Sequence, residues 1–293
     1  MSGALKEVRN RIKSVQSTQQ ITKAMKMVSA AKLRRAQDAI TQMRPYAKKL
    51  QELLSNIVSN SDGDIQSSLM AERKVEKALI IVITSDRGLC GGYNSNLIKL
   101  AKQVAGQKYT EQSAKGNLQF LTIGKKGYEH FGKNNFKIVD QFWGLFSRLG
   151  FESVQEAATY AMNRFANKEV DAVEIVYSEF KNAGTQRYTA EPFLPVMKIE
   201  KKQGENNADF IFEPGKEVLI NELMPKILNT QLYKAVLDAN ASEHGARMTA
   251  MDKASENANE LLKSLKISYN RARQAAITTE LTEIVSGAAA LQG

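Results

Sequence analysis

The chain has 293 residues, of which 43% are hydrophobic, and a formal net charge of +10. This hydrophobic share is enough for a packed core and excludes a chain that is disordered by composition. No apolar run approaches the ~20 residues that a membrane-spanning helix requires, and a single cysteine excludes an intrachain disulfide framework and a cysteine-based zinc site. The sequence therefore predicts a soluble protein of about two structural units, made in a reducing compartment.

The first sixty residues predict a long helix with a basic surface. Between residues 4 and 58 the only helix breaker is Pro45, and residues 1–55 hold 12 Lys and Arg against 3 Asp and Glu. This excess of positive charge indicates an acidic partner, either nucleic acid or an acidic protein surface. The apolar residues start at coiled-coil spacing, turn polar at Gln19 and Thr22, and then shift to Ile21, Met25 and Val28. We interpret the shift as a stutter, where a coiled coil locally unwinds.

The middle of the chain predicts a layered α/β domain, because short apolar strands alternate with helical segments. Expected strands lie at 75–84, 118–123, 136–142, 172–177 and 188–199, and expected helices start near residue 94 and cover 126–131 and 154–166. This alternation favours a mostly parallel sheet.

The glycine-rich segment Ser85–Tyr93 follows the first expected strand and precedes a helix, which is where phosphate-binding loops sit. It lacks both the Gly-Lys-Ser/Thr ending of a P-loop and the dinucleotide fingerprint, so a structural turn or a subunit contact is favoured over nucleotide binding. Cys90 has no histidine near it in sequence, which argues against a reactive thiol. His130 and His244 are too few and too scattered for a metal centre. We find no catalytic constellation and expect no cofactor.

The end of the chain predicts a second, longer helix. From Lys226 to Ser286 there is no proline in 61 residues, which corresponds to a helix of roughly 90 Å. A heptad seam with alternating steps of three and four indicates a left-handed coiled coil, with the positions Leu237, Ala241, His244, Met248, Met251, Ser255, Ala258, Leu262, Leu265, Tyr269, Ala272 and Ala276. Since both long helices meet the middle domain, they should pair antiparallel.

The longer helix should extend beyond Met1 as an apolar tip, and such a tip implies a socket in another protein. Glu280 and Glu283 stand three residues apart in this tip. They could be read as an acid/base pair, but such a pair needs a cleft, so contact or helix-surface roles are favoured for them. The fold expected overall is a long antiparallel coiled coil of the N- and C-terminal helices with an inserted Rossmann-like α/β domain, divided as 1–60, 61–215 and 216–293.

Four segments together resemble the gamma subunit of F-type ATP synthases, and the resemblance covers essentially the whole chain. The most specific is the C-terminal stretch from Ile277 to Ala290, read Ile-Thr-Thr-Glu-Leu-Thr-Glu-Ile-Val-Ser-Gly-Ala-Ala-Ala. The others are Ile21–Val28, Arg44–Tyr46 and Thr84–Asn94.

The resemblance implies a non-catalytic rotor shaft, which couples rotation of a membrane c ring, driven by proton flow, to conformational changes in catalytic beta subunits. It implies one copy per alpha/beta hexamer, with the alpha, beta and epsilon subunits and the c ring as partners. Beta-subunit contacts would fall on Met25, Lys26, Arg273, Gln274 and Thr278. Contacts of the tip with an apolar sleeve would fall on Ile277, Glu280, Leu281, Glu283 and Ile284, and foot contacts on Phe210, Phe212 and Glu213.

Further expectations concern location and regulation. With Cys90 alone, the chain lacks the dithiol switch of plant chloroplast versions, and it carries no transit peptide. A complex peripheral to the cytoplasmic face of a bacterial inner membrane is therefore expected, and a processed organellar chain is the alternative. The alternatives from other classes are a basic coiled-coil adaptor that binds nucleic acid or an acidic protein, and a nucleotide-using enzyme built on the α/β domain.

Overall fold

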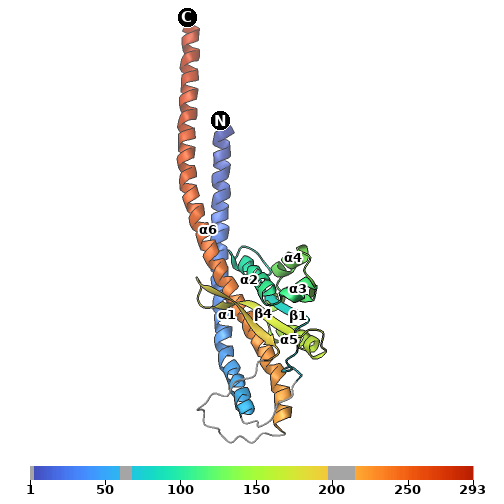
Figure 1. The fold of residues 1–293 in the computed structure, drawn as a ribbon. Helices are drawn as coiled ribbons and strands as arrows, with labels where there is room; N and C mark the ends of the chain where they lie inside the picture. The colour runs from blue at the N-terminus through green and yellow to red at the C-terminus, as the bar shows by residue number, and fades with distance from the viewer. Residues whose placement is uncertain (1–2, 60–67, 197–214, 293) are drawn as a thin grey trace. The chain divides into compact units, whose positions relative to one another are not determined.

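The computed structural model describes residues 3–59, 68–196 and 215–292. They form two long helices at the two ends of the chain, and the segment between these helices in the sequence forms a five-stranded sheet with its own shorter helices (Figure 1). In chain order the elements are α1 (Gly3–Ser59), β1 (Ala78–Ile83), α2 (Tyr93–Gln107), α3 (Thr110–Ala114), β2 (Leu118–Ile123), α4 (Lys125–Lys133), β3 (Ile138–Phe142), the short 3₁₀ helix η1 (Leu145–Arg148), α5 (Phe151–Ala166), β4 (Ala172–Phe180), β5 (Gln186–Leu194) and α6 (Lys216–Gln292).

The chain divides into two compact units, and both long helices contribute to each. The coiled-coil unit comprises Met1–Ser29 and Met248–Gly293, and the sheet unit comprises Ala30–Arg247. The sequence division at residues 60 and 215 stays a prediction. The last helix begins ten residues before the predicted proline-free tract, so that Pro225 lies inside it, as Pro45 lies inside α1.

The sheet has the strand order β3-β2-β1-β4-β5. Strand β1 pairs in parallel with β2 and β4, β2 pairs in parallel with β3, and only β5 runs antiparallel, beside β4. The predicted mostly parallel sheet is therefore confirmed. Every residue of β1 is buried, as expected for a parallel strand with helices on both faces.

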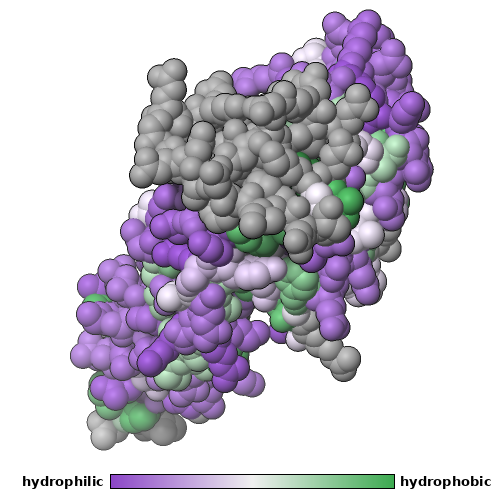
Figure 2. Space-filling view, turned by 90° about the horizontal axis from the view of Figure 1, so that it is seen from below, coloured by the Kyte–Doolittle hydropathy of each residue, from purple (hydrophilic) through white to green (hydrophobic). Residues whose placement is uncertain are grey.

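Side chains alternate between two cores, one on each face of the sheet. On one face, odd-numbered residues of β1 pack with α5 and with the first part of α6, which contributes Ile220, Leu228 and Val236. On the other face, even-numbered residues of β1 pack with α2 and with Phe131 of α4. In the view of Figure 2 the described surface is mainly hydrophilic, and hydrophobic residues appear as small separate spots.

Within the coiled-coil unit, α1 and α6 lie side by side and antiparallel (Figure 1). Polar side-chain contacts between them include the following: Arg9 Nη2 donates to Tyr269 Oη over 2.9 Å, the hydroxyls of Thr22 and Ser255 are 2.7 Å apart, and Lys26 Nζ lies 2.5 Å from Asp252 Oδ1. In each pair the two residue numbers add up to 277 or 278, so the register is constant along the unit.

This constant register shows that the predicted stutter is wrong. The face of α1 turned toward α6 continues without a shift through polar positions, because Thr22 and Ser29 are buried. Ile21 and Val28, to which the seam was expected to shift, are 57% and 58% exposed. The hydrophobicity pattern misled here because the seam changes from apolar to hydroxyl side chains while its geometry stays the same.

Candidate functional site

The candidate surface on α1 lies around the predicted contact residues Met25 and Lys26. Met25 is half-buried against α6, and Lys26 forms an ion pair with Asp252 in which both side chains remain more than 40% exposed. Next to them Ile21, Met27 and Val28 expose between 57% and 68% of their surface. We call these three residues the α1 apolar patch. Large apolar side chains exposed on a helix are candidate positions for an interaction surface.

The α1 apolar patch was not recognised in the sequence because Ile21 and Val28 were assigned to the coiled-coil seam. The signal that could have revealed it is spacing. Leu5, Val8, Ile12 and Val15 already define one seam, and continuing their steps of three and four leads to Thr22 and not to Ile21.

The second candidate surface is the C-terminal tip of α6. Every residue from 277 to 290 is exposed, whereas Ala276 is the last that is partly covered. Ile277, Leu281, Ile284 and Val285 expose between 48% and 68% of their surface and recur at the spacing of one helical face. The tip therefore presents a continuous apolar stripe, with the predicted contact residues Glu280 and Glu283 also exposed.

The predicted contact residues Arg273, Gln274 and Thr278 lie just before and within this tip. All three are exposed, and the hydroxyl of Thr278 donates to the Gln274 carbonyl oxygen of its own helix over 2.9 Å. The guanidinium of Arg273 and the amide of Gln274 thus face solvent on the described chain. The predicted foot residues Phe210, Phe212 and Glu213 lie outside the described residues.

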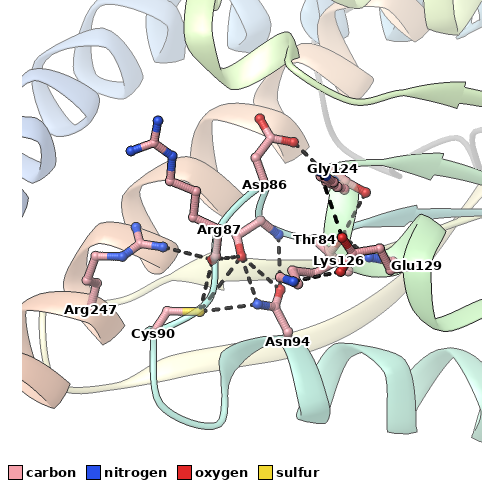
Figure 3. Close-up of polar contacts among 12 residues, drawn as sticks. Thr84, Asp86, Arg87, Cys90, Asn94, Gly124, Lys126, Glu129 and Arg247 are labelled. Carbon is pink, nitrogen blue, oxygen red and sulfur yellow. Dashed lines mark hydrogen bonds and ion pairs between the residues drawn. The ribbon is translucent and has the colours of Figure 1, made fainter.

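The loop after β1 is built from internal hydrogen bonds (Figure 3). The backbone N–H of Ser85 donates to the Asn94 side chain over 3.0 Å, and Thr84 Oγ1 accepts from the N–H of Gly127 over 2.8 Å. The carboxylate of Asp86 accepts from the N–H of Lys125, the first residue of α4, over 3.0 Å. That carboxylate lies at the N-terminus of α4, where the helix dipole favours a negative charge. This arrangement favours a structural turn over a nucleotide site.

A buried ion pair on α6 holds the same loop. Arg247 and Glu243 form a salt bridge in which both side chains are at least 90% buried. Arg247 Nη2 also donates to the carbonyl oxygens of Arg87 and Gly88, over 3.0 and 3.1 Å (Figure 3). Burial raises the pKa of Glu243, and the charge of Arg247 opposes that rise. The pair therefore ties the loop to α6 within the sheet unit.

Cys90 lies inside this loop and is 2% exposed. Burial raises the pKa of its thiol, and the Asn94 side-chain nitrogen contacts the sulfur at 3.2 Å. A buried thiol whose pKa is raised is a poor nucleophile. Over the described parts of the chain, no group of His, Cys, Asp and Glu side chains has the geometry of a metal site, and no helix is long and apolar enough to cross a membrane.

Comparison with known proteins identifies the family. The model of the family described as ATP synthase matches residues 4–291. The ATP synthase gamma chain of Cytophaga hutchinsonii is 50% identical over 98% of this chain and 99% of its own length, and that of Chlorobium phaeobacteroides is 50% identical over 99% of each. The chain belongs to the ATP synthase gamma chain family.

Solved structures agree with membership of the gamma chain family. A chain from the central stalk and c-ring structure of the Tetrahymena thermophila mitochondrial ATP synthase has a TM-score of 0.58 and 25% identity, covering 80% of this chain and 99% of its own length. A chain from the Euglena gracilis mitochondrial ATP synthase rotor has a TM-score of 0.66 and 21% identity, covering 94% of this chain and all of its own length, which supports the fold alone. The resemblance found in the sequence and the expected fold are confirmed, and the nucleic-acid adaptor finds no support.

Proposed function

We propose that this gamma chain is the central rotor shaft of a proton-translocating F-type ATP synthase. As a non-catalytic subunit it couples rotation of a membrane c ring to conformational changes in catalytic beta subunits. The observation that carries this proposal is the apolar tip of α6, in which every residue from 277 to 290 is exposed. Such a stripe on a projecting helix requires a partner surface, and the full-length similarity to gamma chains supports an alpha/beta hexamer as that partner.

The chemistry of the tip suits rotation. Apolar contacts are non-directional, so a helix that turns inside an apolar sleeve meets few angular barriers from hydrogen bonds or ion pairs. Ile277, Leu281 and Ile284 would form this bearing surface, with Glu280 and Glu283 beside them. The shaft changes a beta subunit's affinity for nucleotide only if it contacts that subunit's conformations differently. Directional groups are therefore needed elsewhere on the shaft.

Those directional contacts fall on two parts of the coiled-coil unit. On α6, Arg273, Gln274 and Thr278 would bind a beta-subunit loop, because Arg273 and Gln274 offer exposed donors that no described residue uses. On α1, Met25 and Lys26 would lie against an acidic moving segment of the beta subunit. The balance of 12 basic to 3 acidic residues in 1–55 supports an acidic partner.

The remaining partners follow from the family. The foot, including Phe210, Phe212 and Glu213, would dock with the epsilon subunit and the c ring. One copy would serve each alpha/beta hexamer, and the chain would be peripheral to the cytoplasmic face of a bacterial inner membrane. Native mass measurement of the purified complex tests this assembly directly. A chain that never co-purifies with alpha and beta subunits contradicts the proposal.

A single substitution tests the contact assignment. Arg273→Ala in the assembled complex should lower ATP turnover at least several-fold, because it removes a charged group that binds the beta subunit. Arg271→Ala is the matched control, since Arg271 is also exposed, lies on the same helix and is two residues away, where it faces a different direction. Equal turnover of the two variants, with intact subunit stoichiometry, would contradict the role of Arg273.

A further inference from the structure

We propose that two polar pairs, Thr22 with Ser255 and Lys26 with Asp252, fix the axial register of the coiled coil and thereby set how much of α6 projects as the tip. We call them the register lock. They lie on neighbouring turns of both helices, at the point where the seam of α1 changes from apolar to hydroxyl side chains.

The hydroxyl pair is buried and well bonded. Thr22 and Ser255 are 8% and 7% exposed, and their oxygens are 2.7 Å apart. Each hydroxyl also reaches a carbonyl of its own helix, Gln19 over 3.0 Å and Met251 over 2.8 Å. One hydroxyl can donate across to the other helix while its partner donates back to its own. Facing apolar side chains instead, the two hydroxyls would lose the hydrogen bond between the helices, and each would keep only the bond to the carbonyl of its own helix.

The apolar part of the seam cannot discriminate between registers by itself. A slip of one heptad that brings Leu5 opposite Leu265 would also bring Val8 opposite Leu262 and Ile12 opposite Ala258, and these three pairs stay apolar. The same slip places Thr22 opposite Met248 and Ser255 opposite Val15. Many of the seam residues on α6 are alanines, which fit against several partners. The hydroxyl pair is therefore the feature that disfavours this slipped register.

A slip in the opposite direction is also disfavoured. Ser255 would then lie opposite Ser29 and keep a hydroxyl partner, but Thr22 would face Leu262. Lys26 would move from Asp252 to the level of Asn259, so the ion pair would break. Within the coiled-coil unit the two polar pairs together exclude both neighbouring registers, in the way that single polar seam residues specify register in other coiled coils.

Register determines the length of the free tip. In an antiparallel pair a slip of one heptad moves the end of α6 by seven residues, or about 10 Å, relative to the end of α1. It would also move Arg273 relative to Met25 by the same amount. This functional consequence rests on the proposed contacts with a beta subunit, whereas the register itself is a property of the isolated chain.

The test measures the register in the full-length chain by the distance between two spin labels. Lys6→Cys and Ser286→Cys carry the labels in a Cys90→Ser background, and both positions are exposed. The present register places Lys6 level with Arg271, which gives an axial separation of about 22 Å. A slip that lengthens the tip gives about 33 Å, and a slip that shortens it gives about 12 Å.

The variant that removes the lock combines Thr22→Val, Ser255→Ala and Asp252→Ala. It should show a second population displaced by about 10 Å. The matched control combines Thr18→Val, Ser264→Ala and Glu256→Ala, because these exposed side chains lie on the same helices and the two hydroxyls bond only to their own helix. The control should keep the single distance of the starting chain.

A single, unchanged distance in the lock variant overturns the proposal. If that variant loses its helical signal, the same measurement is made on Thr22→Val alone, where an unchanged single distance again overturns it. The exchange of Thr22→Ser with Ser255→Thr keeps two hydroxyls and should retain one distance. No partner subunit enters these measurements, so their failure is separate from failure of the proposed rotor contacts.

Discussion

The buried pair of Arg247 and Glu243 supplies a prediction about the stability of the sheet unit. In Arg247→Ala, Glu243 loses its counter-charge while it stays buried, and the carbonyl oxygens of Arg87 and Gly88 lose their shared donor. Removing one partner of a buried ion pair costs about 3–5 kcal/mol, because the other charge remains without compensation. Domains are stable by about 5–15 kcal/mol, so this loss is a large fraction of the total.

Solvent exposure decides the size of the effect, and a second ion pair provides the comparison. Arg187 lies 3.8 Å from Glu179, and its side chain is 67% exposed. Exposed pairs contribute about 0–1 kcal/mol, so Arg187→Ala should change the free energy of unfolding little. Arg247→Met with Glu243→Leu removes both buried charges together and should recover much of the loss.

Denaturant unfolding followed by tryptophan fluorescence measures these changes. The chain has one tryptophan, Trp143, and it belongs to the sheet unit. Arg247→Ala should lower the transition midpoint much further than Arg187→Ala. A difference between the two below about 1 kcal/mol would refute the reasoning, because the burial of the ion pair would then have no energetic effect.

The loss of stability in Arg247→Ala should also depend on pH. Burial raises the pKa of Glu243 in the folded state, so the folded protein retains this proton to a higher pH than the unfolded chain does. Stability from this group is therefore present at low pH and is lost as the pH rises through the folded pKa. Arg247→Ala removes the charge that opposes the rise. Its defect should shrink as the pH is lowered from about 8 to about 5, and a defect that grows on acidification would contradict the mechanism.

Two further predictions concern the sheet unit and use the same fluorescence assay. Gly124→Ala should destabilise the sheet unit by about 3 kcal/mol or more, because at a φ of +98° its Cβ would lie 2.1 Å from the Thr84 carbonyl oxygen. Gly116→Ala is the control: its Cβ would meet open space at a φ of +70°, so the substitution should cost about 1–2 kcal/mol. Equal losses of stability in the two variants would contradict this ranking. Burial raises the pKa of Asp238 to about 6, so stability from its protonated form is lost as the pH rises from about 4 through 6. The free energy of unfolding of Asp238→Asn, compared with that of the wild type, should therefore rise by about 2 kcal/mol between about pH 4 and pH 8. A difference between the two proteins that does not depend on pH would contradict titration of Asp238 as the cause.

The fold was predicted from sequence where one physical signal dominated. The continuous apolar run of β1 indicated a buried parallel strand, and the heptad spacing of α6 gave the face that the structure buries from Met251 to Leu265. The register of α1 failed because hydroxyl residues replaced apolar ones in the seam. A prediction from hydrophobicity alone then places the seam at Ile21 and Val28, which are exposed in the structure.

The candidate surfaces were predicted unevenly for a related reason. The tip was recognisable because apolar residues continued beyond the expected end of the partner helix. The α1 apolar patch was not, since its residues have the same composition as a seam and differ only in which face they occupy. The hydrogen bond from Arg247 to the Arg87 carbonyl oxygen in the loop after β1 joins residues 160 positions apart, and no local pattern in the sequence indicates such a contact.

The burial of α6 changes along the helix and divides it into three segments. From Ala235 to Ala239 every residue is buried, so the helix is enclosed on all sides over this stretch of the sheet unit. Between Met251 and Leu265 burial follows the heptad alone, at Met251, Ser255, Ala258, Leu262 and Leu265. From Ile277 onward the described residues are exposed, and an apolar stripe is available to a partner. The sequence achieves this by changing which positions are apolar while helix-forming residues continue throughout. A substitution in α6 should consequently act according to its segment: on unfolding of the sheet unit in the first, on register in the second, and on binding of a partner in the third.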